Sequence, residues 1–201
     1  MHIGDSVIGG LTSVFKWMIG VNAQTTNNWY DPNRKHVVSQ SNASILGNAF
    51  TFGGLKCQLR SYKRCLKDIK NIPQDKKSFV IINWNLQHLI WGQTFDKAKS
   101  WASKFYKLFK KSKAAGEIAS HHTFIFMNGM ALHGFREPYC TQSRSQRFSS
   151  MIEGYAKSVG WKVLDGYNMT LLRTDMSYDG MHYNDAMNYM FAQVLINMMC
   201  E

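Results

Sequence analysis

Two short polar motifs, one near each end of the chain, hold residue types that together could cleave an ester. Near the front, HIGDSVIGG places Ser6 on a glycine-led turn directly before an apolar-periodic segment. Near the back, YDGMHYND places Asp179 three residues before His182. A serine hydroxyl is a weak nucleophile that needs a base, and a histidine held by a carboxylate is the usual one. Ser6, His182 and Asp179 are therefore a candidate catalytic triad for acyl transfer.

Acyl transfer also needs preorganised donors for the oxyanion of the tetrahedral intermediate. Ser6, at a helix start, offers its own backbone N–H. A backbone N–H of Gly53 or Gly54 could be a second donor, and the side-chain amide of Asn83 or Asn85 a third. Each of these features alone is also typical of an ordinary helix cap or turn. Their occurrence together, in this order, is what favours a single site.

The elements that must position these residues follow from hydrophobic periodicity. Five segments repeat apolar residues at spacings of three and four, which predicts helices; they are residues 7–18, 55–69, 98–108, 148–159 and 187–198. Short continuous apolar runs between them predict strands buried on both faces; they are 79–82, 123–127 and 162–164, with 2–3 and a stretch within 45–52 as two more.

Alternating strands and helices indicate an α/β fold with a mostly parallel sheet. At 201 residues the chain is expected to form one domain, residues 1–201. Ligands of such sheets bind at the carboxyl ends of the strands. The polar clusters around Ser6, Gly53, Asn83 and His182 all follow predicted strands or precede helices, so they are expected at that one edge.

The motifs resemble those of the SGNH/GDSL hydrolase superfamily, and most closely its PC-esterase-like branch. The resemblance covers nearly the whole chain, with HIGDSVIGG, FGGL, VIINWNLQHLIWG and VLDGYNMT followed by DGMHYND. It implies a three-layer α/β/α sandwich with a mostly parallel central sheet (SGNH/flavodoxin-like) and neither metal nor cofactor. It also implies that Ser6 is the nucleophile and Asp179 and His182 the rest of the triad.

The same resemblance implies oxyanion-hole roles for a glycine and an asparagine. The glycine maps to Gly53 or Gly54, and the asparagine to Asn83. Many relatives read N-x-G or G-x-N-D in the third block, whereas this chain reads Asn83-Trp84-Asn85. The donor therefore stays open between Asn83 and Asn85, with Asn83 preferred because it directly follows a predicted strand.

The expected substrate is a small-molecule or glycan ester. An O-acyl esterase, with acetyl as the expected acyl group on a carbohydrate or lipid, is the leading interpretation. An O-acyltransferase with the same triad, a catalytically silent module that binds glycans or polyanions, and a structural protein are the alternatives. His133 and Arg136, in a loop after a predicted strand, are weaker candidates for substrate binding.

Composition adds fewer constraints. The net charge of +11 suits a polyanion, but much of the surplus lies in residues 97–113, which reads as the solvated face of one helix. No helix-turn-helix, finger or RNA-binding motif is present, so no specific nucleic-acid partner is expected. No apolar run is long enough to span a bilayer, and no signal peptide is visible, although a trimmed N-terminus would leave the same pattern. A monomer is the default expectation.

Cysteines and glycosylation motifs bear on the compartment. Four cysteines allow three disulfide pairings if all are oxidised, and none has the C-x-x-C spacing of a zinc site. Two N-x-S/T sequons start at Asn42 and Asn168. Together they favour, weakly, a secreted protein or a secretory lumen.

Overall fold

The computed structural model describes residues 59–75, 77–84, 94–133 and 141–200 with their side chains, and the backbone of four short strands nearer the N-terminus. Those four are β1 (His2–Ile3), β2 (Ser41–Asn42), β3 (Thr51–Phe52) and β4 (Gly54–Leu55). The later strands are β5 (Phe79–Ile82), β6 (Thr123–Met127) and β7 (Lys162–Leu164).

The central sheet has five parallel strands in the order β4-β1-β5-β6-β7. β1 lies between β4 and β5, so the chain adds strands on one side of β1 and then on the other. Such a reversal creates a crevice at the carboxyl ends of the two diverging strands, where α/β proteins place their ligands. Ile3, the last residue of β1, is in register with Ile82, the last residue of β5. Both strands therefore end at the same edge.

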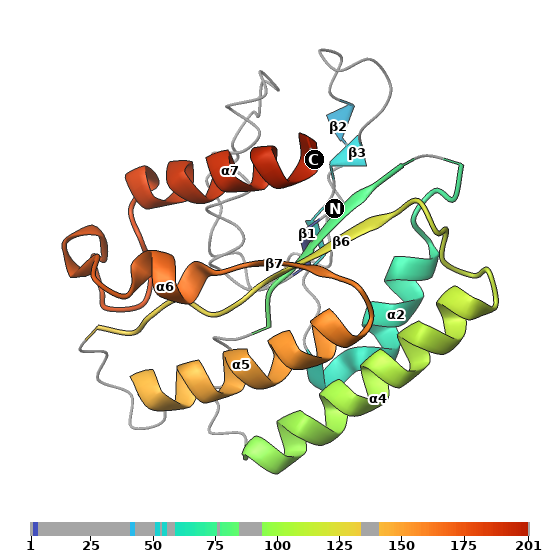
Figure 1. Ribbon diagram of the computed structural model, residues 1–201, viewed down its shortest axis with the longest axis horizontal. Helices are drawn as coiled ribbons and strands as arrows, with labels where there is room; N and C mark the ends of the chain where they lie inside the picture. Colours follow the sequence, from blue (N-terminus) through green and yellow to red (C-terminus); the bar gives the residue numbers. More distant parts are fainter. Residues whose placement is uncertain are drawn as a thin grey trace, which may run out of the picture.

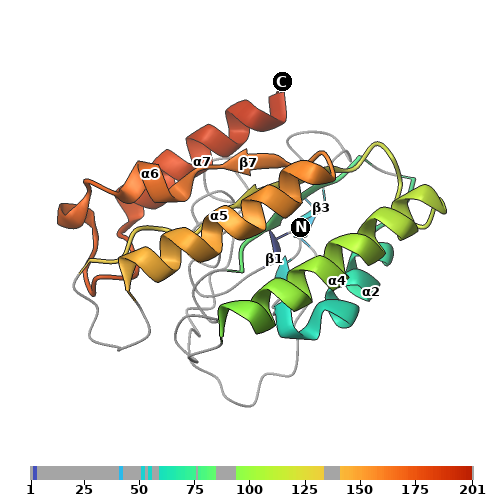
Figure 2. The same cartoon turned by 60° about the horizontal axis from the view of Figure 1, so that its bottom comes forward.

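Helices cover both faces of this sheet (Figures 1 and 2). On one face lie α2 (Tyr62–Lys70), α4 (Phe95–Ala114) and α5 (Gln142–Ser158), and on the other lies α7 (Asp185–Cys200). Two short helices, η2 (Leu59–Ser61) and α6 (Gly166–Thr170), and the turn η3 (Thr174–Met176) complete the described elements. This is the predicted three-layer α/β/α architecture.

Alternate residues of the strands enter two separate cores. Val80 and Ile82 pack among the side chains of α2, α4 and α5, whereas Ile81 packs with those of α7. Phe124 and Ile125 of β6 divide in the same way. Successive strand side chains point to opposite faces, so a strand covered on both sides must be apolar throughout. The apolar runs therefore predicted the bounds of β5 and β6 correctly, and those of β7, which begins with the half-buried Lys162, were predicted correctly as well.

The second predicted strand and helix differ from what the periodicity indicated. Leu55 belongs to β4 rather than to a helix, and the helix begins only at Tyr62. Gly54, expected after a strand, lies within β4 and pairs with His2. Glycine pairs usually mark turns, but here ladder pairing with β1 decides the conformation. Part of the stretch 45–52 forms β3, which pairs with β2 in a separate antiparallel sheet. The helix predicted over 7–18 lies outside the described residues.

Two further features concern cysteines and membranes. Cys65, fully buried on α2, is disulfide-bonded, whereas Cys200 is an exposed free thiol. The four cysteines are therefore not all paired. A disulfide is typical of proteins from oxidising compartments. Among the helices the structure describes, none is long and apolar enough to cross a bilayer.

Candidate active site

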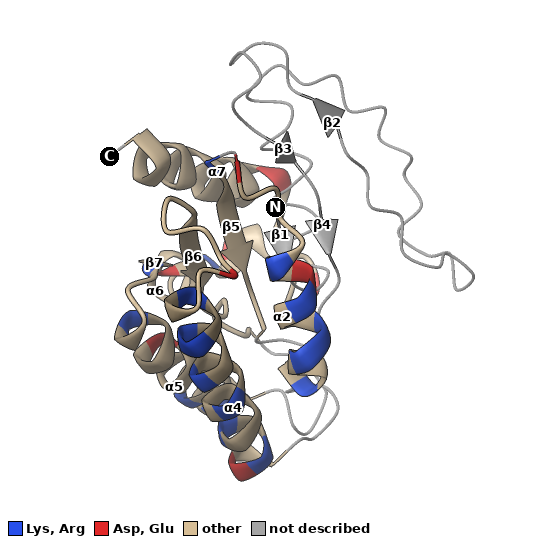
Figure 3. Ribbon diagram, turned by 90° about the vertical axis from the view of Figure 1, so that its right-hand side faces the viewer, with Lys and Arg blue, Asp and Glu red and all other residues tan. Residues whose placement is uncertain are grey.

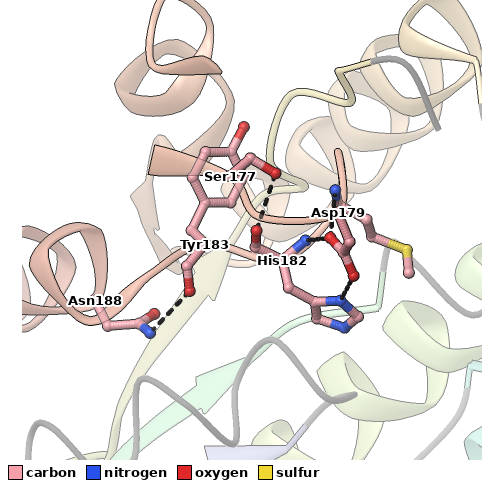
Figure 4. Close-up of polar contacts among 6 residues, drawn as sticks. Ser177, Asp179, His182, Tyr183 and Asn188 are labelled. Carbon is pink, nitrogen blue, oxygen red and sulfur yellow. Dashed lines mark hydrogen bonds and ion pairs between the residues drawn. The ribbon is translucent and has the colours of Figure 1, made fainter. Parts of the chain in front are cut away.

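Asp179 and His182 form a hydrogen-bonded pair in the loop before α7 (Figure 4). The ring Nδ1 of His182 lies 2.6 Å from Oδ2 of Asp179, and the backbone N–H of His182 donates to Oδ1 at 2.6 Å. The N–H of Met181 donates to the same Oδ1 at 2.9 Å. A carboxylate only accepts hydrogen bonds, so Nδ1 carries the proton in this pair. A neutral His182 then presents the lone pair of Nε2 as a base.

The backbone of this loop is closed around the pair. Gly180 has φ of 83°, the left-handed region that residues with a Cβ rarely adopt. Ser177 and Tyr183 form an antiparallel bridge, and the Ser177 hydroxyl donates to the His182 carbonyl at 2.9 Å. The turn thus brings a carboxylate and an imidazole three residues apart into contact without help from other elements.

Two hydrogen bonds attach this loop to the segment that follows β6. The buried Tyr183 hydroxyl donates to the carbonyl of Ala131 at 2.8 Å. The backbone N–H of His133 donates to the carbonyl of Gly180, also at 2.8 Å. Because β6 ends at Met127, these contacts place Asp179 and His182 at the carboxyl edge of the sheet. This is the edge at which the sequence predicted them.

The electrostatics of Asp179 favour the charged carboxylate. Partial burial acts to raise its pKa, but the hydrogen bonds from the His182 ring and from the N–H groups of His182 and Met181 outweigh it. The pKa of Asp179 is therefore held below its ordinary value. An ionised Asp179 can stabilise an imidazolium on His182, which is what the base becomes after taking a proton.

His133 lies in the segment that follows β6, and its ring is partly buried against α6. Its Nε2 is 3.1 Å from the carbonyl oxygen of Thr170. A carbonyl only accepts hydrogen bonds, so Nε2–H is the donor in this contact. The Thr170 hydroxyl accepts the N–H of Ala131 at 2.9 Å. The structure therefore gives His133 a supporting contact, and its expected role in substrate binding stays a prediction. Arg136 lies outside the described residues.

Asn83 directly follows β5, as predicted, and is 2% exposed. Its Nδ2 donates to the carbonyl of Met127 at 3.1 Å and lies 3.5 Å from that of Asn128. The amide is thus held against the end of the neighbouring strand β6. It lies at the correct edge for an oxyanion donor, and its N–H groups already have main-chain acceptors there.

Two other polar residues at this edge, Asn128 and Asp165, are hydrogen-bonded to each other. The Asn128 amide donates to Oδ1 of Asp165 at 2.9 Å, and its oxygen accepts the N–H of Tyr167 at 2.9 Å. Asp165 also accepts the N–H of Asn168, which caps α6. These contacts join the ends of β6 and β7, and they explain both residues as structural supports of the edge.

Several predicted site residues lie outside the described residues, namely Ser6, Gly53 and Asn85. Gly54 is described only as part of β4. The structure therefore brings Asp179, His182 and Asn83 to one edge, with β1 ending at the same edge three residues before Ser6.

Tyr178 is a further residue of the site that the motifs did not single out. Its ring is 73% exposed and stacks on that of His182, with 5.9 Å between centroids and 11° between planes. Such an offset arrangement is favourable for aromatic pairs. The only signal in the sequence was an aromatic residue directly before Asp179. No group of three or more metal-ligating side chains occurs in the part of the chain that the structure describes.

Solved structures of GDSL-type proteins share this fold. A member of the lipolytic G-D-S-L family from Veillonella parvula has a TM-score of 0.60 at 13% identity, covering 100% of this chain and 97% of that chain. A GDSL-like lipase from Bacteroides thetaiotaomicron has a TM-score of 0.62 at 15% identity, with coverage of 98% and 85%. An acetylxylan esterase from Geobacillus stearothermophilus has a TM-score of 0.55 at 13% identity, with coverage of 98% and 91%.

By sequence, no protein-family model and no curated protein matches this chain. The structural similarity nevertheless shows that the chain has the fold of the SGNH/GDSL hydrolases. The resemblance inferred from the GDS and DGMH motifs is thereby confirmed at the level of the fold.

Proposed function

We propose that this protein is a carboxylic ester hydrolase that cleaves O-acyl esters through Ser6, His182 and Asp179. The observation that carries the proposal is the 2.6 Å contact between Nδ1 of His182 and Oδ2 of Asp179 at the carboxyl edge of the sheet. A histidine oriented in this way can act as the general base that activates a serine nucleophile. The fold supports the assignment, since proteins named as lipases and acetylxylan esterases share it.

The position of β1 supports Ser6 as the nucleophile. β1 ends at Ile3, and three further residues span at most about 10 Å of chain. β1 and β6 are separated by β5 alone, so their ends lie about 10 Å apart. The loop that carries His182 is attached just beyond the end of β6. A turn at residues 4–6 can therefore deliver a serine hydroxyl to Nε2 of His182.

The proposed reaction runs in two steps. Nε2 of His182 takes the proton of the Ser6 hydroxyl as its oxygen attacks the ester carbonyl, and the imidazolium then protonates the departing alcohol. An acyl-serine remains, which water resolves with the same base. Asn83 or Asn85, a backbone N–H of Gly53 or Gly54, and the N–H of Ser6 hold the oxyanion. The whole chain, residues 1–201, is taken as one domain with this activity.

The substrate is proposed to be an O-acylated carbohydrate or a lipid ester, with acetyl as the acyl group. The exposed Tyr178 ring beside His182 supports the carbohydrate, because an aromatic face can pack on a sugar ring. An acyltransferase would use the same acyl-serine and differ only in the alcohol that resolves it.

Hydrolysis of a chromogenic acetyl ester tests this proposal. Ser6→Ala and His182→Ala should each lower turnover by about 10⁶ if the triad acts as a unit. Ser158→Ala is the matched control, because Ser158 is exposed at the end of α5 and its hydroxyl donates to the carbonyl of Tyr155, away from His182. Wild-type protein that is folded and shows no hydrolysis, or Ser6→Ala protein with full activity, would contradict the proposal.

A further inference from the structure

The positive charge of the protein is concentrated on one face. η2, α2 and α4 together carry 12 of the chain's 24 lysines and arginines but only 2 of its 13 acidic residues, Asp68 and Asp96. These elements therefore hold a surplus of ten positive charges, compared with +11 for the whole chain. Figure 3 shows Lys and Arg along α2 and α4, which lie side by side on the same face of the sheet.

Several lysines of each helix lie in a row along it. On α4, Lys97, Lys104 and Lys111 recur every seven residues, with Lys107 beside them, and all four are exposed. Seven residues are two turns of a helix, about 10 Å, so these ammonium groups lie in a row. On α2, Lys63, Lys67 and Lys70 follow the same rule at spacings of four and three. We name this double row the basic face.

Part of this pattern has a local explanation. Lys70 pairs with Glu117 at 2.7 Å, and lysines in the last turns of α2 and α4 complement the helix dipoles. Lys97 lies in the first turn of α4, where the helix dipole disfavours positive charge. The dipole therefore does not explain its placement in line with Lys104 and Lys111, and an extended anion provides a reason.

From this arrangement we infer that the basic face binds an acidic polysaccharide that carries the O-acyl esters this enzyme cleaves. The inference rests on the proposed function for the ester. α4 follows β5 and runs antiparallel to the strands, so Lys97 lies at the carboxyl edge of the sheet, as the candidate site does, and Lys111 lies toward the opposite edge. An extended polymer lying along α4 for about 30 Å would thus lead to the edge where His182 lies.

The side chains of this face favour a polysaccharide over a membrane. Among the described residues, the exposed large hydrophobic side chains are Leu172, Tyr178, Tyr189 and Met190, and none is on α2 or α4. Peripheral membrane helices bury such groups at the acyl boundary. The basic residues of α4 are all lysines, point charges without the planar fork by which arginine reads phosphates and base edges. Double-stranded DNA, moreover, carries no O-acyl ester.

Binding of polygalacturonate, used as the acidic probe, tests this inference separately from catalysis. The variant Lys104→Gln/Lys107→Gln/Lys111→Gln should weaken binding about tenfold at low salt, and the wild-type affinity should fall as salt rises. The matched control, Lys157→Gln/Lys162→Gln/Arg173→Gln, removes three positive charges outside the basic face and should bind like the wild type. The triple replacement of the same three lysines by arginine keeps the charge and should restore binding.

Each contrary outcome overturns a distinct statement. Equal binding of polygalacturonate by the lysine variant and the control would overturn the statement that the basic face is the binding surface. Tighter binding at about 0.15 M salt to anionic vesicles or to double-stranded DNA than to polygalacturonate would overturn the polysaccharide in favour of a lipid surface or a nucleic acid. Protein that binds the polymer but hydrolyses no ester would overturn the proposed function alone. Protein that hydrolyses esters without binding the polymer would overturn this inference alone.

Discussion

Asp179 holds His182 at two points, the ring Nδ1 through Oδ2 and the backbone N–H through Oδ1, each at 2.6 Å. The first contact sets the tautomer of the imidazole. The second fixes the position of the His182 backbone, from which the side chain extends. The two functions belong to different oxygens of one carboxylate, so they can be separated by substitution.

Asp179→Asn should keep the backbone contact and lose the tautomer control. An amide oxygen can still accept the two N–H groups, whereas an amide NH₂ facing Nδ1 favours the tautomer with its proton on Nε2. Turnover of an acetyl ester should fall by about 10⁴, with little change in the free energy of unfolding. Steady-state kinetics and thermal unfolding of the same preparation check this. Unchanged turnover would remove Asp179 from the catalytic machinery.

Gly180→Ala should damage both stability and activity. The left-handed conformation at φ of 83° costs a residue with a Cβ about 1–2 kcal/mol, and the turn that aligns Asp179 with His182 depends on it. Gly160→Ala is the matched control, because Gly160 has φ of 79° and lies between α5 and β7, away from His182. Both variants should lose stability, and only Gly180→Ala should lose turnover. Equal turnover would show that the loop tolerates a different backbone.

Asn83→Ala tests which asparagine stabilises the oxyanion. Loss of the buried contact with the Met127 carbonyl should cost about 1–3 kcal/mol of stability in any case. If Asn83 is also the donor, turnover should fall by a further factor of about 10²–10³ with little change in KM. Asn85→Ala, measured alongside, should then be close to wild type. The reverse pattern would assign the donor to Asn85 and leave Asn83 a structural role.

His122 should make the protein less stable in mild acid. It is 4% exposed, it precedes β6 at the edge opposite the site, and neither ring nitrogen has a hydrogen-bond partner in the described structure. Burial, together with the nearby His121, lowers its pKa. The folded state therefore binds this proton less readily than the unfolded state. Stability should fall as the pH drops below about 6.5, the ordinary pKa of histidine.

Unfolding by urea at a series of pH values checks this dependence. His122→Phe removes the titrating group and should flatten the curve between neutral and mildly acidic pH. His121→Gln, next to it on the surface, should keep most of the slope. A wild-type curve that does not fall in this range would contradict the account of His122.

The sequence was most informative where one physical rule decided the structure. β5 and β6 are covered on both faces, so nearly all their residues had to be apolar, and their bounds were predicted correctly, as were those of the shorter β7. The Asp179–His182 pairing was also predictable, because the four residues 179–182 contain the whole interaction.

Other features depend on contacts that no local pattern carries. Gly54 lies in a strand only because β1 pairs beside it, a relation between distant segments. The Tyr183 hydroxyl donates a hydrogen bond to the carbonyl of Ala131, 52 residues away in the sequence. The stacking of Tyr178 on His182 depends on the conformation of the loop that holds both. The basic face could be predicted on α4 alone, since the position of α2 next to it is a property of the fold.

Labelling with a fluorophosphonate probe, followed by mass spectrometry of the modified peptide, tests the central claim most directly, because the reagent reacts with activated serines. The account predicts one phosphonate, on Ser6, in the wild-type protein and its loss in His182→Ala. A folded wild-type protein that takes no label, or a label on another serine, would contradict the assignment of Ser6 as the nucleophile.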